Sequence, residues 1–300
     1  MYDLIIIGAG PAGITAAVYA ARKKMNLLVI SKDIGGQAAL SGDIENYTGY
    51  QFITGVDLAA KFEEHMRKYD ITLKENEEVN EAQKRGDLIS VKTNKGAYEA
   101  KTVIIASGKK SRELNVPGEK EFKNKGLTYC ATCDGPLFSG KDIAIIGGGN
   151  SCLDAALQLI KIARHVYIVN ITSGLGGDAI MREKVEASKN VTILNNTQVA
   201  AIIGDKMVSG IRIKREGKQE QLVVQGVFVE VGLIPNSDFV KEVEKNQLGE
   251  IEVNSRNETS IPGILAAGDV TDVPEKQIII AAGEGSKAAL SAFRYLSQRK

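Results

Sequence analysis

The 300-residue sequence has few of the residues that build structural metal sites: it holds three cysteines and two histidines. Structural zinc takes about four Cys or His ligands in two close pairs. Cys130 and Cys133 form one close pair, but Cys152, His65 and His165 do not form a second. We therefore expect no metal site, and we interpret the close pair as a dithiol/disulfide couple.

The sequence also lacks a charge excess and a long hydrophobic run. The formal net charge is +1, whereas binders of nucleic acid or anionic membranes usually carry a large basic excess. No window approaches the roughly 18 apolar residues of a spanning helix, and the first apolar run, Leu4 to Ile7, is too short for a signal peptide core. We expect a cytoplasmic protein with no nucleic-acid or membrane partner, and thiols are kept reduced in that compartment.

Two segments of the chain resemble each other. They are YDLIIIGAGPAGITAAVYAARKKMNLLVIS, residues 2–31, and DIAIIGGGNSCLDAALQLIKIARHVYIVN, residues 142–170. Each has an apolar run, a glycine cluster, a stretch with helical apolar spacing and a second apolar run. This order predicts strand, tight turn, helix and strand, twice, in a chain long enough for two domains.

The first glycine cluster has the pattern of a dinucleotide-binding turn. Gly8, Gly10 and Gly13 follow a predicted strand and open a predicted helix, which is the context that this motif requires. Such glycines let the backbone turn tightly and approach a pyrophosphate, and they let the helix pack closely on the sheet. The sequence therefore predicts a dinucleotide site here.

Strand-like runs with turn signals fill the rest of the chain. They are Leu88 to Thr93, Thr102 to Ala106, Val191 to Leu194, Val208 to Lys214 and Gly226 to Val231. Proline-containing joints at 116–119 and 233–236 mark the expected crossings between domains. After them, Ile264 to Gly268 returns to the strand-then-glycine pattern of the first domain.

These observations predict an α/β fold of two Rossmann-like, three-layer ββα dinucleotide-binding domains, with the second domain inserted into the first. The expected bounds are 1–114 and 245–300 for the first domain. The inserted domain, 115–244, carries the CxxC pair.

Motifs along the whole chain, in order, resemble those of the low-molecular-weight thioredoxin reductases, a family of flavoprotein disulfide reductases. The C-terminal part is also similar to the reductase part of bacterial peroxiredoxin reductases. The motifs are GAGPAG at 8–13, GGQ at 35–37, ENYTG at 45–49, CATCDG at 130–135, GGGNS at 147–151, AAGDV at 266–270 and KQIIIAAGEG at 276–285.

The resemblance implies that the first domain binds FAD. Gln37 and Asn46 match positions along the flavin, Asp269 matches the acid that holds the ribityl chain, and Gln277 with Ile278 match contacts to the flavin ring. A helix N-cap is the alternative role of Asp269. The implied FAD contacts are Gly8, Gly10, Pro11, Ala12, Gly13, Gly36, Gln37, Asn46, Gly108, Asp269, Gln277 and Ile278.

The resemblance also gives the cysteine pair a chemistry. It implies that Cys133 faces the flavin, that Cys130 attacks the disulfide of the protein substrate, and that the protein is a homodimer. Asp134 would give and take the proton that thiol exchange requires. A turn residue in Asp-Gly is its alternative role.

The second glycine cluster departs from the NADPH-dependent pattern. Cys152 replaces a smaller residue, and we expect it to be inert packing. NADP needs positive charge at the end of the next strand, where this chain has Asn170 and Thr172, with Arg182 well downstream. The first cluster also lacks the acid that holds a ribose, at Ser31, although the resemblance implies FAD there.

We therefore favour reduced ferredoxin over NADPH or NADH as the donor, with Lys109, Lys110 and Arg112 as candidate docking residues. A solvated loop is their alternative reading. The favoured function is an FAD-dependent reductase of thioredoxin. The alternatives are an NADPH- or NADH-dependent reductase of thioredoxin or a peroxiredoxin, and a flavin redox sensor without a donor.

Overall fold

The computed structural model describes residues 1–298, which fall into two compact units. Among them, the first unit combines residues 1–110 with residues 234–298, and the second is Ser111–Leu233. The second unit therefore interrupts the first, as the sequence predicted. Both crossings lie inside short strands that pair with each other, β9 (Lys109–Ser111) and β18 (Leu233–Pro235).

Both crossings come earlier in the chain than the expected bounds 114/115 and 244/245. Val116 packs in a core of the second unit, so the 116–119 joint belongs to that unit. Val240 and Val243 pack in a core of the first unit. The proline joint at 233–236 does coincide with a crossing, because β18 lies there.

The first unit is built around strand β1, which pairs in parallel with β2 and β8. β5 adds to β2, β19 adds to β8, and β6 and β7 continue from β8 as an antiparallel ribbon. The elements are β1 (Tyr2–Ala9), α1 (Pro11–Arg22), β2 (Leu27–Ile34), α2 (Gly36–Leu40), β3 (Asp43–Ile44), β4 (Ile53–Thr54), α3 (Gly55–Arg67), β5 (Thr72–Glu75), β6 (Val79–Arg85), β7 (Leu88–Thr93), β8 (Ala97–Ile105), β19 (Ile264–Ala266) and α8 (Ile278–Ser297).

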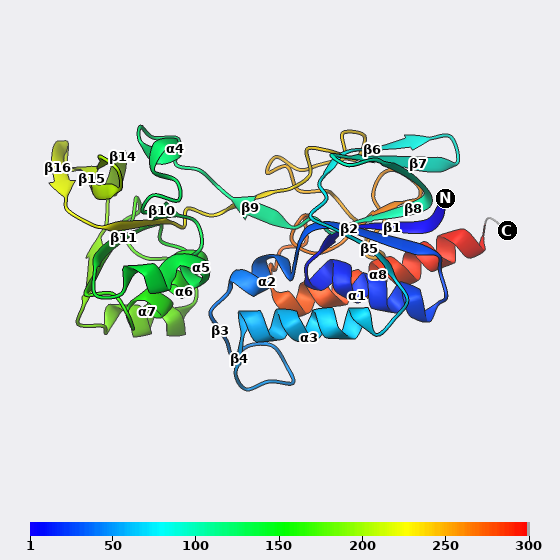
Figure 1. Cartoon of the computed structure of the whole chain (residues 1–300), viewed down its shortest axis with the longest axis horizontal. Helices are drawn as coiled ribbons and strands as arrows, with labels where there is room; N and C mark the ends of the chain where they lie inside the picture. The colour runs from blue at the N-terminus through cyan, green and yellow to red at the C-terminus, as the bar shows by residue number, and fades with distance from the viewer. Residues whose placement is uncertain (299–300) are drawn as a thin grey trace. The chain divides into compact units, whose positions relative to one another are not determined.

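Alternate residues of β1 face two different layers. Leu4 and Ile6 pack on the side of α1 and α8, and Ile5 and Ile7 pack on the side of β6 and β7. Figure 1 shows α1, α3 and α8 on one side of the sheet and the β6–β7 ribbon on the other. Because both faces are covered, the strand is an uninterrupted apolar run in the sequence.

The second unit repeats these three layers. Its parallel sheet has the order β10-β17-β11-β12-β13, and its antiparallel sheet has the order β14-β15-β16. The elements are α4 (Glu119–Phe122), β10 (Leu127–Thr128), α5 (Ala131–Asp134), the 3₁₀-helix η1 (Gly135–Phe138), β11 (Asp142–Ile146), α6 (Asn150–Leu159), β12 (His165–Val169), α7 (Ala179–Glu186), β13 (Val191–Leu194), β14 (Thr197–Gly204), β15 (Val208–Arg215), β16 (Lys218–Leu222) and β17 (Gly226–Val229).

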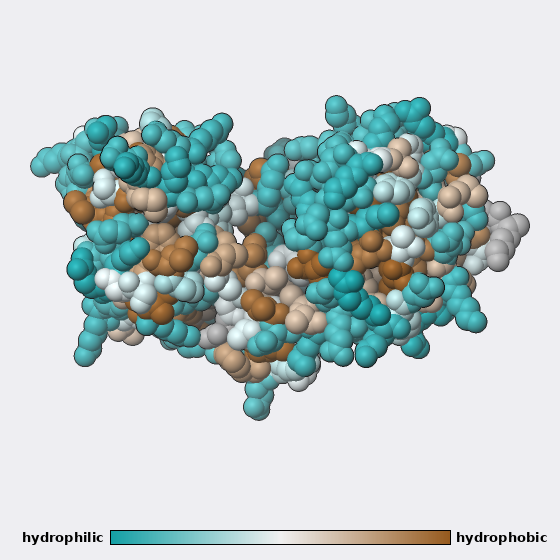
Figure 2. Space-filling view, viewed as in Figure 1, coloured by the Kyte–Doolittle hydropathy of each residue, from teal (hydrophilic) through white to brown (hydrophobic). Residues whose placement is uncertain are grey.

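Both faces of the second parallel sheet are covered as well. Ile143 and Ile145 of β11 face the core with α6, and Ala144 and Ile146 face the core with β14 and β15. The predicted α/β fold of two Rossmann-like units is therefore confirmed. The surface seen in Figure 2 is mainly hydrophilic, with hydrophobic residues in separate patches. Within residues 1–298, no helix has the length and apolar character needed to cross a bilayer.

Candidate active site

The first glycine turn is tight because two of its glycines are in contact with backbone. Gly8 has φ +104°, and a Cβ there would lie 2.3 Å from the carbonyl oxygen of Ala106. A Cβ on Gly13 would lie 1.9 Å from the carbonyl oxygen of Gly8. Only glycine permits this approach of α1 to β1. Pro11 begins α1, whose N-cap, Gly10, provides no side-chain hydrogen bond.

Residues far apart in sequence are paired within the first unit, and one of them lies beside this turn. The α-carbon of Gly10 lies 3.3 Å from the position of a Cβ on Gly36. The Asn46 side-chain amide donates to Gln277 Oε1 at 3.1 Å, and Gln277 is the N-cap residue of α8. The Gln37 amide donates to the carbonyl oxygen of Lys109 at 3.3 Å. The structure therefore brings these predicted residues together within the first unit.

Asp269 follows β19, at the carboxyl edge of the same parallel sheet. A Cβ on the preceding Gly268 would lie 2.9 Å from the Ala12 side chain, at the start of α1. Burial raises the pKa of Asp269, and the positive charges of Lys276 and Lys109 oppose that rise. Asp269 is not the N-cap residue of α8, because that position is Gln277.

The sequence analysis missed a buried ion cluster beside Asp269. Glu250 Oε1 lies 2.9 Å from Lys109 Nζ and 3.1 Å from Lys276 Nζ, and its side chain is only 8% exposed. Burial alone would raise the pKa of Glu250, but hydrogen bonds from Asn246, Lys109 and Lys276 outweigh it and hold the pKa at about 2. The Lys109 side chain, 13% exposed, is therefore not the surface cation that ferredoxin docking would need.

Cys130 and Cys133 form a disulfide with their α-carbons 5.4 Å apart. Cys130 is the N-cap residue of the one-turn helix α5, where the backbone N–H of Cys133 donates to Cys130 Sγ at 3.1 Å. Cys133 is exposed and Cys130 is half-buried. The redox couple thus sits at the start of a helical turn, a position that favours a thiolate.

Asp134 is connected to Cys130 through a residue that the sequence analysis missed. Thr128 Oγ1 donates to Asp134 Oδ2 at 2.5 Å and accepts from the backbone N–H of Cys130 at 3.1 Å. Gly135 has helical backbone angles, φ −48° and ψ −46°. The Asp-Gly pair is therefore not a left-handed turn, the conformation in which glycine would be required.

The second glycine turn also begins with a glycine in close backbone contact. Gly147 has φ +148°, and a Cβ there would lie 2.1 Å from the carbonyl oxygen of Glu230. Cys152 is a free cysteine with no exposed surface. Burial, and then the charge of Glu230, raises its pKa to about 12. Its expected role as inert packing agrees with these surroundings.

Asn170 directly follows β12, and its side chain is hydrogen-bonded to its own loop and to Asn195. Its side-chain amide donates to the carbonyl oxygens of Thr172 and Gly174 and to Asn195 Oδ1, and its oxygen accepts from Thr172. Gly176 N–H donates to the carbonyl oxygen of Gly148, so the loop returns to the glycine turn. Among the described residues, no lysine or arginine takes part in these hydrogen bonds of Asn170 and Thr172.

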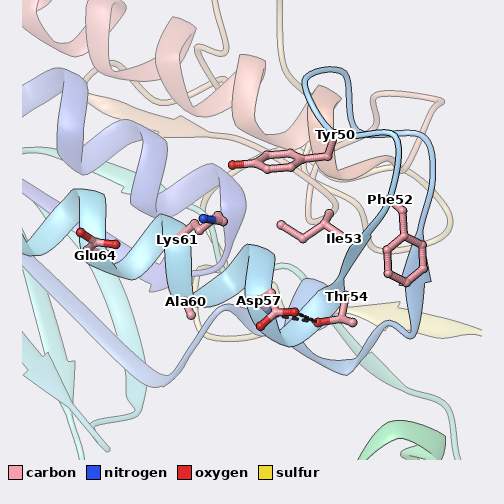
Figure 3. Close-up of a pocket in the computed structure, with 8 residues that line it drawn as sticks. All are labelled: Tyr50, Phe52, Ile53, Thr54, Asp57, Ala60, Lys61 and Glu64. Atoms are coloured by element: carbon pink, nitrogen blue, oxygen red, sulfur yellow. Dashed lines mark hydrogen bonds between the residues drawn. The ribbon is translucent and has the colours of Figure 1, made fainter.

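Two further features carry no argument for the site. A hollow of about 520 Å³ lies between residues 50–54 and α3. In it Tyr50 points toward Lys61, and the Thr54 hydroxyl donates to Asp57 (Figure 3). None of the predicted FAD contacts lines this hollow. Gly108 has φ +61° and open space around it. Within residues 1–298, no three His, Cys, Asp or Glu side chains are grouped to hold a metal ion.

Comparison with known proteins places this geometry among oxidoreductases. The family model of pyridine nucleotide-disulphide oxidoreductases matches residues 2–285. NADH dehydrogenase of Bacillus subtilis strain 168 is 44% identical over 299 residues, 98% of this chain and 58% of that protein. An alkyl hydroperoxide reductase subunit of Pseudomonas putida is 43% identical over 303 residues, with the same coverage of 98% and 58%. The chain thus spans 58% of the length of these relatives.

A solved structure matches over the whole length of both chains. Thioredoxin reductase of Lactococcus lactis, in its FR conformation, aligns with a TM-score of 0.95 and 33% identity, covering 99% of this chain and 100% of that chain.

Proposed function

Because the chain belongs to the pyridine nucleotide-disulphide oxidoreductase family, we propose that it is a flavin-dependent reductase that uses the Cys130–Cys133 pair to reduce the disulfide of a protein substrate. Its fold is that of the thioredoxin reductases. The observation that carries the proposal is the disulfide at the start of α5, linked through Thr128 to the carboxylate of Asp134. FAD, the donor and the acceptor are parts of this proposal.

The residues of the first unit fit FAD. The glycine turn leaves no side chain between β1 and α1, and both α1 and α8 start without a side-chain cap. Uncapped helix N-termini favour anions such as a pyrophosphate. Asn46, Gln37 and Asp269 would supply polar contacts to the rest of the group. When bound, FAD supplies the exchange of two electrons between donor and disulfide.

The cysteines carry the reducing power to the substrate. Reduction of the pair breaks its S–S bond with two electrons and two protons. Cys130 then loses its proton to solvent and attacks the substrate disulfide as a thiolate, which forms a mixed disulfide and releases one substrate thiolate that takes up a proton from solvent. Cys133 attacks Cys130 Sγ, which restores the pair and releases the second thiolate. Asp134 takes the Cys133 proton and gives it to the leaving sulfur.

The proposed donor is a pyridine nucleotide, with NADH first. The relative named NADH dehydrogenase and the Rossmann-like second unit support this choice. NADPH comes second because Asn170 and Thr172 offer no charge for its 2′-phosphate. Reduced ferredoxin, which the sequence favoured, has no support in the two relatives, and the buried ion pair of Lys109 removes one of its docking candidates.

The proposed acceptor is thioredoxin or a peroxiredoxin-type protein. Thioredoxin is supported by the Lactococcus lactis structure, and the second acceptor by the similarity to an alkyl hydroperoxide reductase. A homodimer is proposed on the family resemblance, and sedimentation velocity tests it. A redox sensor would lack rapid turnover with any donor.

The test is to reduce the purified protein anaerobically with NADH, NADPH and reduced ferredoxin in parallel while following flavin absorbance. Turnover is then measured with thioredoxin and with a peroxiredoxin as separate acceptors. We expect bleaching by NADH within seconds and acceptor reduction that Cys133→Ser abolishes. Cys152→Ser is the matched control, since it removes the third thiol and should keep turnover. Turnover that survives Cys133→Ser would contradict the proposal.

A further inference from the structure

The two glycine turns differ at one matched position. In each unit the first glycine packs against the carbonyl oxygen of a residue that follows a neighbouring strand: Ala106 for Gly8 and Glu230 for Gly147. At this matched position the side chain is the methyl group of Ala106 in the first unit and the carboxyl-bearing side chain of Glu230 in the second. The third small position differs too, with Cys152 in the place of Gly13. The dithiol chemistry proposed above gives Glu230 no role.

Glu230 follows β17, where its backbone N–H donates to Ile146 at 2.7 Å. Its carboxyl interacts with three side chains of α6: it is hydrogen-bonded to Ser151, the charge of Asp154 acts on it, and its own charge acts on the thiol of Cys152. Burial, and then the charge of Asp154, raises the pKa of Glu230 to about 8, against a smaller lowering by Ser151. Among the described residues, no lysine or arginine contributes to this shift.

The start of α6 is otherwise suited to a pyrophosphate. Its N-cap residue, Gly149, has extended backbone and no side-chain cap, and its first turn holds no acid. A Cβ on Gly149 would meet nothing within 4 Å. Backbone N–H groups at such a start favour a dinucleotide pyrophosphate. An ionised Glu230, hydrogen-bonded to Ser151 in the first turn of α6, would place a negative charge beside this helix start, and like charges repel there.

We propose that Glu230 decides whether the second glycine turn accepts a pyridine dinucleotide: the turn binds the dinucleotide when this carboxyl is protonated and rejects it when the carboxyl is ionised. The inference rests on the pyridine-nucleotide donor proposed above and adds the residue that controls its binding. It implies that binding at alkaline pH takes up one proton from solution.

The test is titration calorimetry of the full flavoprotein with NAD⁺, which binds without reducing the flavin. Titrations run between about pH 6.5 and pH 9, each in two buffers of different ionisation enthalpy so that proton uptake is measured directly. With the pKa of Glu230 at about 8, the affinity should be about tenfold weaker at pH 9 than at pH 7. Proton uptake should rise from near zero to about one per NAD⁺ over the same range.

Three variants separate Glu230 from its surroundings. Glu230→Gln keeps the shape and stays neutral, so its affinity should be independent of pH, with no proton uptake. Asp154→Asn removes the charge that helps to raise the pKa of Glu230, so the loss of affinity should begin at lower pH. Glu220→Gln, on the exposed strand β16, makes the same charge change away from the turn and should titrate like the wild type.

Two results overturn the proposal, and they are distinguishable. If NAD⁺ affinity does not change with pH, or if Glu230→Gln keeps the pH dependence of the wild type, Glu230 does not control the site and the donor assignment stands. If neither the wild type nor any variant binds NAD⁺ at any pH, both the proposed pyridine-nucleotide donor and the proposed control by Glu230 are contradicted. Reduction of the dithiol by another donor would still support the rest of the proposed function.

Discussion

Asp134 is the carboxylate nearest in sequence to the redox pair, and its contact with Thr128 connects it to Cys130. We predict that Asp134→Asn slows reduction of the protein substrate about a hundredfold, because an amide cannot cycle a proton and general acid–base help is typically worth that much. Stopped-flow oxidation of the reduced enzyme by thioredoxin measures the step.

The control is Asp205→Asn, which makes the same change at an exposed position of the same unit. Both variants should melt within a few degrees of the wild type. An unchanged rate across the pH range for Asp134→Asn would leave Asp134 as a structural end of α5.

The two sulfurs can be told apart spectroscopically. Cys130→Ser leaves Cys133 as a free thiol, and we expect a long-wavelength charge-transfer band in this variant because the family resemblance implies that Cys133 faces the flavin. Cys133→Ser should keep FAD and show no such band. Absorbance spectra of both oxidised variants decide the order, and a band only in Cys133→Ser would reverse the two roles.

Glu250 should contribute to stability as well as to the site. Glu250→Gln leaves Lys109 and Lys276 without their anion, and breaking a buried ion pair on one side costs about 3 kcal/mol. The folded-state pKa of about 2 lies below the ordinary 4.5. The stabilisation is therefore complete above about pH 4.5 and is lost as pH falls toward 2.

Urea unfolding at about pH 7 and pH 3 measures this effect, and the difference between wild type and Glu250→Gln should shrink at the lower pH. Glu81→Gln removes the partner of an exposed lysine, Lys92, and is the control that should change little. Equal loss of stability in the two variants would contradict the role of the buried cluster.

Sequence reasoning could predict candidate residues that belong to motifs, and it missed contacts that depend on tertiary structure. Gly8 and Gly13 are recognisable because a backbone contact demands glycine at a fixed spacing. Glu250 and Thr128 belong to no motif, since their partners meet them only after folding. Lys109 was misread for the same reason, because a charged residue in a loop gives no sign of a buried partner.

At the scale of the element, packing of α1 on β1 depends on Gly13. We predict that Gly13→Ala loses most bound flavin and destabilises the protein by about 1–3 kcal/mol, because the added Cβ overlaps the backbone of Gly8 and α1 must move. Flavin absorbance after gel filtration and thermal melting measure the two effects.

The matched control is Gly283→Ala on α8, where a Cβ would meet nothing within 4 Å. Alanine is the better helix former by up to about 1 kcal/mol, so this variant should melt slightly higher and keep its flavin. Full flavin in Gly13→Ala would mean that the close approach of α1 is not required.

The elements were predictable where one local signal dominates. The runs Leu88 to Thr93 and Val191 to Leu194 coincide with β7 and β13, since apolar or alternating runs between turn signals favour strands. The crossings between units were displaced because proline marks a joint only locally. Val240 and Val243 belong to the first unit because they pack in its core, and no local sequence pattern indicates which core a residue joins.

At the scale of the whole molecule, the three cysteines give a simple count. In the oxidised chain Cys152 is the one free cysteine among the described residues, and it is buried with a raised pKa. We predict slow labelling of the native oxidised protein, one labelled thiol after denaturation and three after reduction and denaturation. Mass spectrometry after alkylation counts them, and rapid native labelling would show that Cys152 is accessible.

Because the second unit is inserted into the first, the two units are completed at different times during translation. Residues 111–233 are contiguous and carry their whole parallel sheet, so this unit can fold as soon as it leaves the ribosome. The first unit lacks β19 and α8 until translation has passed the whole insert. While the insert is being translated, the half-made sheet therefore lacks the pairing of β19 with Val103–Ile105 of β8, and α1 lacks its cover by α8, so apolar surface stays exposed to aggregation for that time.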